Sequence, residues 1–402
     1  MGSIIKSNKL RWFILIITPI IFMNFYCYVG FNPNITKLFL FAAAAFLLAR
    51  YYKEIFFKKF ERRSFSRNIQ WYILLILITH LTAYFVWGQS ISQTFRASAA
   101  IFAILYYFIL KEFKVNKNDL IKIIAIFAAI YAVLWLFAVS QAPRVVFGLA
   151  EELGNDRGFF RVIGLPGLHL LLLFYYYALY KATTVNMKRV LWVSVCIVSL
   201  VIIVLSLTRT VIISTLLISA IFLFKRRPKI TIMLTIVLFL GGGSLFMNNK
   251  VVSSLFELTI DQKDKAGNNE LAVRNEEYSL LFELFPPHPV TTIVGNGTPH
   301  TESSYGKREE QLKEVYRFHR SDAGYVSLFL TYGVVGVIIL FSFLKKAYKT
   351  IASEDMLCYK MYIYSFFIVN MTGDSYVKNM IPFVLAIYGL ELARTNNKKK
   401  IQ

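Results

Sequence analysis

Apolar stretches of about 20 residues recur from one end of the chain to the other, and they constrain the fold more than any other feature. A helix needs about 20 consecutive apolar residues to cross the roughly 30 Å hydrocarbon core of a bilayer. Backbone groups inside a bilayer must be hydrogen-bonded internally, so stretches of this length favour helices. The chain of 402 residues, of which 56% are hydrophobic, is therefore predicted to be an all-α polytopic membrane protein.

Hydropathy predicts about 12 transmembrane helices. The run from Trp12 to Phe31 follows a basic N-terminus, but it is too long for the core of a usual signal peptide and is interpreted as a first retained span. No repeat or Pro-rich linker divides the chain, so we expect a single integral membrane domain over residues 1–402. The predicted spans lie near residues 12–31, 33–49, 69–89, 93–110, 119–140, 163–180, 190–208, 210–224, 230–247, 323–344, 360–372 and 377–393.

The charge distribution predicts the orientation of these spans. The chain carries 45 Lys and Arg against 23 Asp and Glu, a formal charge of +22. Such a charge can indicate nucleic-acid binding, but membrane proteins gather Lys and Arg in their cytoplasmic loops. Most of the basic residues fall on one side of the membrane if both termini are cytoplasmic. Clusters such as FKRRPK are therefore interpreted as topology signals and contacts to anionic lipid, and no nucleic acid is expected as a partner.

One long segment, residues 248–321, is predicted to lie outside the membrane, inserted between the ninth and tenth spans. Its mixed charges predict a helix from Asn269 to Phe285, followed by a turn-rich section that leads back to the membrane. A shorter outside loop covers residues 141–162. We expect any chemistry on this outer face, where ATP is not available.

The sequence lacks the patterns of several common sites, namely GxxxxGK[ST], HExxH, CxxC and DxD. The three cysteines, Cys27, Cys196 and Cys358, lie in or beside apolar runs and are interpreted as small buried hydrophobic residues. No metal site and no cofactor are therefore predicted.

Arginines at the outer ends of predicted spans are the candidates for binding an anionic substrate, because a guanidinium stays charged and forks onto phosphate oxygens. Arg161 precedes an apolar span in RVIGLPG, and Arg209 lies between two apolar runs in LSLTR. Arg274 lies on the predicted loop helix. Each also has a structural alternative, which is interfacial snorkelling for Arg161, a turn for Arg209 and an ion pair on a solvated face for Arg274.

The stretch RFHRSDAGYVSLFLTYGVVG gathers charged residues at the start of the predicted tenth span. Asp322, with Ser321, is suited to cap a helix that begins near Ala323. Alternatively, Asp322 or His319 would accept a proton from a sugar hydroxyl while the arginines stabilise a departing pyrophosphate. Further candidates of lower rank are Arg157, Arg317 and Arg320.

Taken in order, RVIGLPG before a span, LSLTR between two spans, an Arg-bearing helix that runs into PHPVTTIVGNG, and SDAGYVSLFLTYGVVG resemble the superfamily of O-antigen ligases and Wzy-type polymerases of O-antigen or exopolysaccharide. The resemblance covers roughly residues 155–345. It implies a GT-C-like fold with one large periplasmic or extracellular loop, and glycosyl transfer on the outer face of the bacterial inner membrane. The implied donor is a glycan linked to polyprenyl diphosphate, such as undecaprenyl diphosphate, and no metal is implied.

The resemblance also implies roles for individual residues. Arg161, Arg209 and Arg274 correspond to the arginines that hold the pyrophosphate. Asp322 or His319 would act as the base or orient the attacking hydroxyl, with Arg209 also taking part in catalysis.

The position of one histidine favours a polymerase over a ligase. Ligases of this superfamily typically place a His-Asn pair ahead of a GxxG motif, and in this chain that register falls on Asp322 and Ala323. The nearby His319 is displaced from it. The resemblance therefore implies an enzyme that joins oligosaccharide repeat units into O-antigen, capsule or exopolysaccharide. The alternative is a ligase that moves the finished glycan to lipid A-core of lipopolysaccharide.

A flippase or transporter of lipid-linked oligosaccharides, without chemistry, is a further alternative. Against it, the arginines gather at the outer ends of spans, whereas an alternating-access path favours charges near the midplane and two related halves. The partners that the resemblance implies are the lipid-linked donor and acceptor, the bilayer, a flippase and a chain-length regulator.

Overall fold

The computed structural model of the chain describes most of its residues. The predicted span at 230–247 lies outside the described part, as does the beginning of the predicted outside loop. All regular secondary structure in the described part is helical, apart from an isolated bridge between Tyr28 and Phe147, which confirms the predicted all-α class. The described residues are 8–26, 28–29, 31–142, 144–147, 162, 164–184, 188–206, 208–226, 270–285, 288–316, 319–373 and 375–401.

Each predicted span within the described part corresponds to helical structure, and the span predicted at 93–110 is a succession of α4, the 3₁₀ segment η1 and α5. The loop helix predicted from Asn269 to Phe285 is confirmed as α12. In chain order the elements are α1 (Asn8–Met23), α2 (Pro33–Phe56), α3 (Phe65–Trp87), α4 (Ile91–Ser98), η1 (Ala99–Leu105), α5 (Tyr106–Glu112), α6 (Lys117–Ser140), α7 (Leu168–Thr184), α8 (Arg189–Leu205), α9 (Arg209–Arg226), α12 (Glu270–Leu284), α13 (Pro289–Val294), α14 (Ser304–Glu314), η2 (Arg320–Asp322), α15 (Tyr325–Lys349), η3 (Glu354–Met356), α16 (Leu357–Val369), α17 (Ser375–Lys378) and α18 (Met380–Ile401).

Helical segments of membrane-spanning length identify a multi-pass membrane protein. By length and composition, five segments of the described part can cross a bilayer. The finer expectation of about 12 spans stays a prediction. The five segments are Asn34–Phe56, Phe65–Trp87, Ile91–Glu112, Lys117–Ser140 and Tyr325–Lys349.

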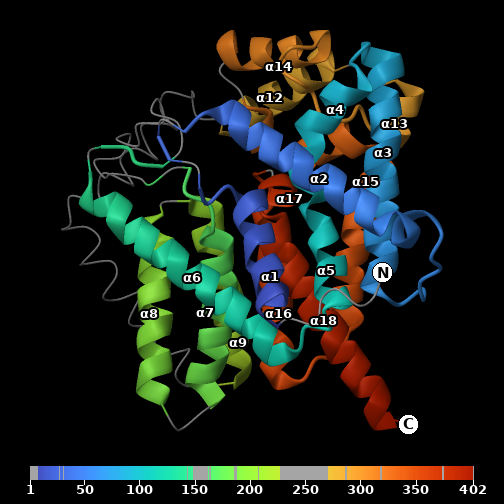
Figure 1. Cartoon of the computed structure of the whole chain (residues 1–402). Coiled ribbons are helices and arrows are strands. Elements are labelled where there is room, and N and C mark those ends of the chain that lie inside the picture. The colour runs from blue at the N-terminus through green and yellow to red at the C-terminus, as the bar shows by residue number, and fades with distance from the viewer. Residues whose placement is uncertain are drawn as a thin grey trace.

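The helices lie side by side in a bundle, with a small helical cap at one end (Figure 1). Helices α7, α8 and α9 form one side, α3 and α15 form the other, and α16 and α18 lie between them. Helices α12 and α14 form the cap, beside the place where α3 ends and α4 begins.

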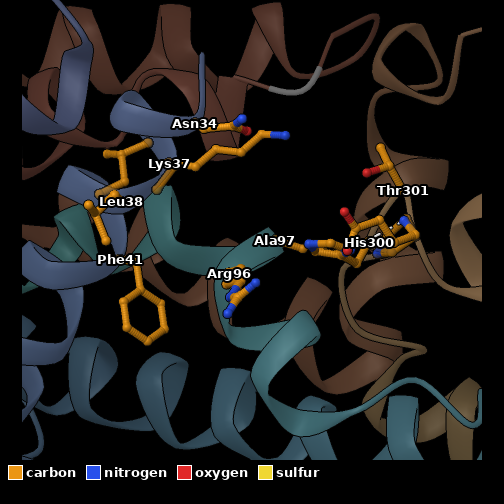
Figure 2. A pocket seen from close by; sticks show the side chains of 12 residues that line it. Asn34, Lys37, Leu38, Phe41, Arg96, Ala97, His300 and Thr301 are labelled. Carbon is orange, nitrogen blue, oxygen red and sulfur yellow. Dashed lines mark hydrogen bonds between the residues drawn. The ribbon is translucent and has the colours of Figure 1, made fainter. Parts of the chain in front are cut away.

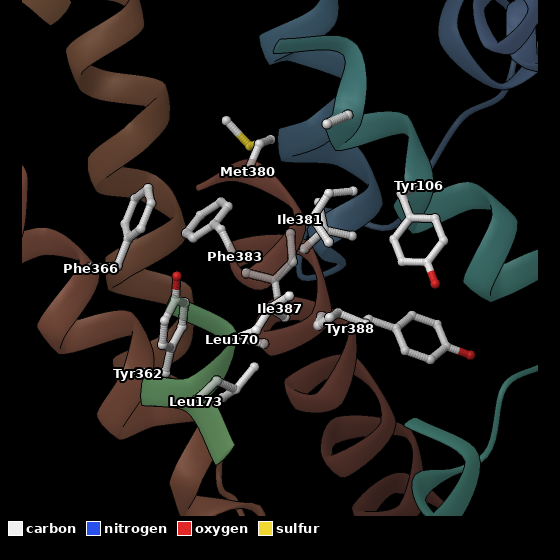
Figure 3. Packing of buried hydrophobic residues seen from close by; sticks show 14 of the residues in the cluster. Tyr106, Leu170, Leu173, Tyr362, Phe366, Met380, Ile381, Phe383, Ile387 and Tyr388 are labelled. Carbon is white, nitrogen blue, oxygen red and sulfur yellow. The ribbon is translucent and has the colours of Figure 1, made fainter. Parts of the chain in front are cut away.

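A continuous cluster of buried apolar side chains holds the bundle together (Figure 3). At its centre the rings of Phe366 on α16 and Phe383 on α18 stack with centroids 4.5 Å apart. Tyr106 and Leu170 bring α5 and α7 to the same cluster. Large aromatic side chains contribute the most buried area per residue, so they dominate this packing.

Helix α15 is broken at Gly333, and the break receives the loop that follows α13. Gly333 has φ +62° and ψ −168°, outside the helical region, so carbonyl groups of the preceding turn become free to accept other donors. The backbone N–H of Asn296 donates to the Leu330 carbonyl at 2.9 Å, and that of Gly297 donates to the Thr331 carbonyl at 3.0 Å. The loop backbone thereby replaces hydrogen bonds that an unbroken helix would make within itself.

Glycines allow this close approach of two backbones. A Cβ at Gly295 would lie 2.1 Å from the Thr331 carbonyl oxygen, and a Cβ at Gly333 would lie 2.4 Å from the Ile293 carbonyl oxygen. The element that packs against α15 here is the short α13 with its loop rather than another long helix.

Replacing Gly295 by Ala is expected to destabilise the protein far more than replacing Gly88 by Ala. Both glycines have positive φ, +90° and +64°, but a Cβ at Gly88 would meet no atom within 4 Å. Gly88→Ala should lower the unfolding free energy by roughly 1 to 2 kcal/mol, and Gly295→Ala by roughly 3 to 5 kcal/mol, because strain and overpacking add. Thermal unfolding in detergent measures the stability of both variants. Equal losses of unfolding free energy would contradict the close contact between Gly295 and the backbone of α15.

Candidate functional site

The first residues of α9 and the residues before α15 meet on one short segment, 370–372, which follows α16. Thr210 Oγ1 lies 2.7 Å from Thr372 Oγ1, within hydrogen-bond distance. On the other side, the backbone at Gly324 packs so closely that a Cβ there would lie 2.4 Å from the Met371 carbonyl oxygen. Arg209 directly precedes Thr210, so the structure brings Arg209 to the same segment as the residues that precede α15.

Asn370 holds this segment in place. Its side chain is fully buried, its Nδ2 donates to the Phe366 carbonyl at 2.7 Å, and its Oδ1 accepts from the backbone N–H of Tyr376 at 2.9 Å. The Tyr376 hydroxyl in turn lies 3.0 Å from Ser327 Oγ on α15. A buried amide is stable only when its hydrogen bonds are made, and here they tie α16, α17 and α15 to one another.

Asp322 and His319, the candidates for the base, are exposed ahead of α15. The backbone N–H of Asp322 donates to the His319 carbonyl at 2.8 Å, which closes the 3₁₀ turn η2. Ser321 Oγ lies 3.3 Å from an Asp322 carboxylate oxygen. Both candidate side chains are therefore accessible from outside the protein and belong to one turn.

The predicted capping of a helix near Ala323 by Ser321 and Asp322 is wrong. Helix α15 begins at Tyr325, its N-cap residue is Gly324, and no side chain caps it. Gly324 has φ +53°, a conformation that favours glycine. Its backbone lies directly against the carbonyl groups of the segment 370–372, which leaves no room for a Cβ. Asp322 thus has no capping role and remains a candidate for the chemistry.

Arg320, a candidate of lower rank, is buried and holds the cap to the bundle. Its side chain is 3% exposed. One guanidinium nitrogen donates to the Tyr305 hydroxyl at 3.2 Å, the other to Thr331 Oγ1 at 2.8 Å, and the group lies 5.3 Å from the ring centroid of Phe285. Burial acts to lower the pKa of Arg320, but Tyr305, Glu309 and Tyr376 together raise it above its usual value, so the group stays charged. These contacts give Arg320 a structural role within the protein.

Arg320→Ala is therefore expected to destabilise the protein by roughly 3 to 5 kcal/mol, because its buried partners lose their charge-assisted hydrogen bonds. Thermal unfolding of the purified chain measures the loss. Lys307→Ala, which removes an exposed cation from α14, is the control and should leave the unfolding temperature unchanged. Normal stability of Arg320→Ala combined with lost activity would instead place Arg320 at the substrate.

The remaining candidates are described only in part. Arg274 falls on α12, as predicted, but its side chain is not among those described. His169 on α7 is buried, and its Nδ1 lies 3.1 Å from the Tyr362 hydroxyl. The candidates outside the described residues are Arg157, Arg161 and Arg317.

Sequence reasoning missed the segment 370–372. Asn370 and Thr372 belong to no motif with a known spacing, and they follow directly on the apolar run of α16. The available signal was the placement of an amide and a hydroxyl at the end of an apolar helix, where polar groups are costly unless they have a partner.

Part of this chain is similar to a known protein family. The family model for the O-antigen ligase matches residues 194–341. The matched range includes Arg209, Arg274, His319 and Asp322, and it begins after Arg161. No curated protein matches the chain. This match over residues 194–341 confirms the resemblance to the O-antigen ligase and polymerase superfamily.

Proposed function

We propose that this protein is a membrane glycosyltransferase that polymerises oligosaccharide repeat units linked to polyprenyl diphosphate, on the outer face of the bacterial inner membrane. The observation that supports it most is the meeting of α9 and the start of α15 on the segment 370–372. Arg209 precedes one of these contacts by one residue and Asp322 precedes the other by two, and both residues lie inside the range that matches the family. An enzyme of this kind needs a fixed cation for the leaving diphosphate and a basic group for the attacking hydroxyl.

The proposed reaction is a single displacement. A hydroxyl of the acceptor repeat unit attacks the anomeric carbon of the donor glycan, and the bond from that carbon to the diphosphate oxygen breaks. The hydroxyl proton goes to Asp322 or His319, and polyprenyl diphosphate leaves with the bonding electrons. One displacement inverts the anomeric configuration and needs no covalent enzyme intermediate.

Arg209 would stabilise the charge that develops on the leaving diphosphate, together with Arg161 and Arg274. A guanidinium held in position before the reaction does not need to reorganise as this charge develops, so it lowers the barrier. Loss of one such donor commonly costs about 3 kcal/mol in the barrier, or about a hundredfold in rate. Asp322 is exposed, which suits a group that must reach the hydroxyl of an incoming glycan.

A ligase that transfers the finished glycan to lipid A-core is the second candidate. The name of the matching family, O-antigen ligase, favours it. The register of Asp322, at the place where ligases carry histidine, favours the polymerase. The two enzymes share the donor, so the acceptor distinguishes them.

Glycan chain length in a host strain tests this proposal. We expect that deleting the gene leaves single repeat units on the lipid anchor or core, and that Arg209→Ala and Asp322→Ala do the same at normal protein levels. Arg226→Ala removes a cation at the other end of α9 and should keep the normal chain length. If long glycans accumulate on polyprenyl diphosphate in the deletion strain, the polymerase proposal is wrong and the ligase proposal replaces it.

The Thr210–Thr372 contact should matter for rate more than for stability. Thr372→Val keeps the shape of the side chain but removes the hydroxyl that meets Thr210, so Arg209 should lose its fixed position relative to the segment 370–372. We expect a slower reaction by about tenfold, because modest misplacement of a catalytic group is costly. Thr372→Ser retains the hydroxyl and should restore the rate of repeat-unit addition in membranes. Equal defects in both variants would exclude this positioning role.

A further inference from the structure

A cavity of about 660 Å³ lies between the first turns of α2, the α4–η1 segment and the loop that precedes α14 (Figure 2). None of the residues discussed above as candidates for the reaction lines it.

Two cations, Lys37 on α2 and Arg96 on α4, line the cavity. Figure 2 shows Lys37 extending from α2 toward the loop that carries His300, with Arg96 on the α4 side. Within the described residues, neither Lys37 nor Arg96 has an ion-pair partner, although Glu302 also lines the cavity. Two cations without carboxylate partners at one cavity are suited to bind an anion, and phosphate oxygens are common ligands of Arg and Lys.

The loop that carries His300 forms a polar wall of the cavity, and Gln89 holds this loop in place without a ligand. Gln89 is fully buried, and its Nε2 donates to Thr94 Oγ1 at 2.7 Å and to the Thr298 carbonyl at 2.9 Å. Its Oε1 accepts from the backbone N–H of His300 at 2.9 Å and from Ser303 Oγ at 2.7 Å. A single amide side chain therefore fixes the loop to α4, and the cavity keeps its shape without a ligand.

His300 is oriented to donate a hydrogen bond. Its Nδ1 accepts the backbone N–H of Glu302 at 3.3 Å, so the proton of a neutral ring lies on Nε2. The cavity wall then offers the Nε2 donor, the Asn34 amide, the Thr301 hydroxyl and the Glu302 carboxylate. These are the groups that bind hydroxyl-rich molecules.

The other face of the cavity is apolar and continues onto an exposed helix surface. Leu38 and Phe39 are 62% and 47% exposed, and Phe46 further along α2 is 67% exposed. Helix α2 is long and apolar enough to cross a bilayer, so these side chains are suited to contact lipid chains. Cations at the first turns of such a helix lie where lipid head groups lie.

We propose that this cavity binds the phosphate-bearing head of a membrane amphiphile. Lys37 and Arg96 hold the phosphate, the wall around His300 binds hydroxyl groups of the head, and the apolar chain lies along α2. We identify this amphiphile as a second lipid-linked glycan, bound apart from the Arg209 site. This identification rests on the proposed function. An anionic phospholipid has the same phosphate chemistry and is the other possible source.

Photo-crosslinking at the cavity tests this proposal. The full chain carries Leu38→benzoylphenylalanine and is placed in phosphatidylcholine nanodiscs with radiolabelled polyprenyl diphosphate. We expect a crosslink that decreases by about tenfold in Lys37→Gln/Arg96→Gln, because both phosphate ligands are lost. Lys307→Gln/Lys313→Gln removes the same charge from exposed positions on α14 and should leave the crosslink unchanged. Unchanged thermal unfolding confirms that the variants fold.

Competition identifies the source of the ligand. A polyprenyl diphosphate that displaces the label at about tenfold lower concentration than phosphatidylglycerol supports a substrate site, and equal displacement supports a general site for anionic lipid. A crosslink of equal strength in Lys37→Gln/Arg96→Gln, or equal loss in both double variants, overturns the proposal. The crosslink does not depend on turnover, so its outcome is independent of the glycan chain-length experiment.

Discussion

The backbone carbonyls of Leu330 and Thr331 must be hydrogen-bonded, and this requirement determines the structure at the end of the bundle that carries the helical cap. At the Gly333 break in α15, these groups accept from the backbone of Asn296 and Gly297 instead of from their own helix. An unpaired carbonyl within a membrane protein is costly, so the loop and the broken helix stabilise one another. The same turn of α15 also receives Arg320 through Thr331 Oγ1. One irregular turn therefore fixes both the loop that leads to the cavity and the residues that lead to Asp322.

The proposed chemistry depends on groups from distant parts of the chain being held rigidly. Arg209 begins one helix, Asp322 precedes another, and the segment 370–372 contacts both regions. Electrostatic catalysis is effective only when the charges are in place before the reaction. The hydrogen bonds of the buried Asn370 hold this segment in position. The exposed candidates for the base thus lie beside a segment that the fully buried Asn370 holds in place.

Local patterns made most of the fold predictable, and long-range contacts account for what was missed. Apolar runs located the helices, and charge and turn residues located α12. The capping role of Asp322 was wrong because the φ of Gly324 is determined by carbonyls of the segment 370–372, far away in the sequence. Arg320 gave no local signal of burial, since its partners Phe285 and Tyr305 come from other helices. For the same reason, no spacing in the sequence joins Lys37 to Arg96 and His300.

The hydrogen bonds between the end of α3 and the loop also set an order of assembly during synthesis. Trp87 and Gln89 each bond to residues 209 positions later, at Asn296 and Thr298. At ordinary translation rates, the ribosome needs roughly 10 to 40 seconds to add that length. During this interval the Trp87 indole N–H lacks its native partner, and the Gln89 amide has only Thr94. The cap therefore forms late, and a chaperone or insertase that shields the end of α3 would act in that interval.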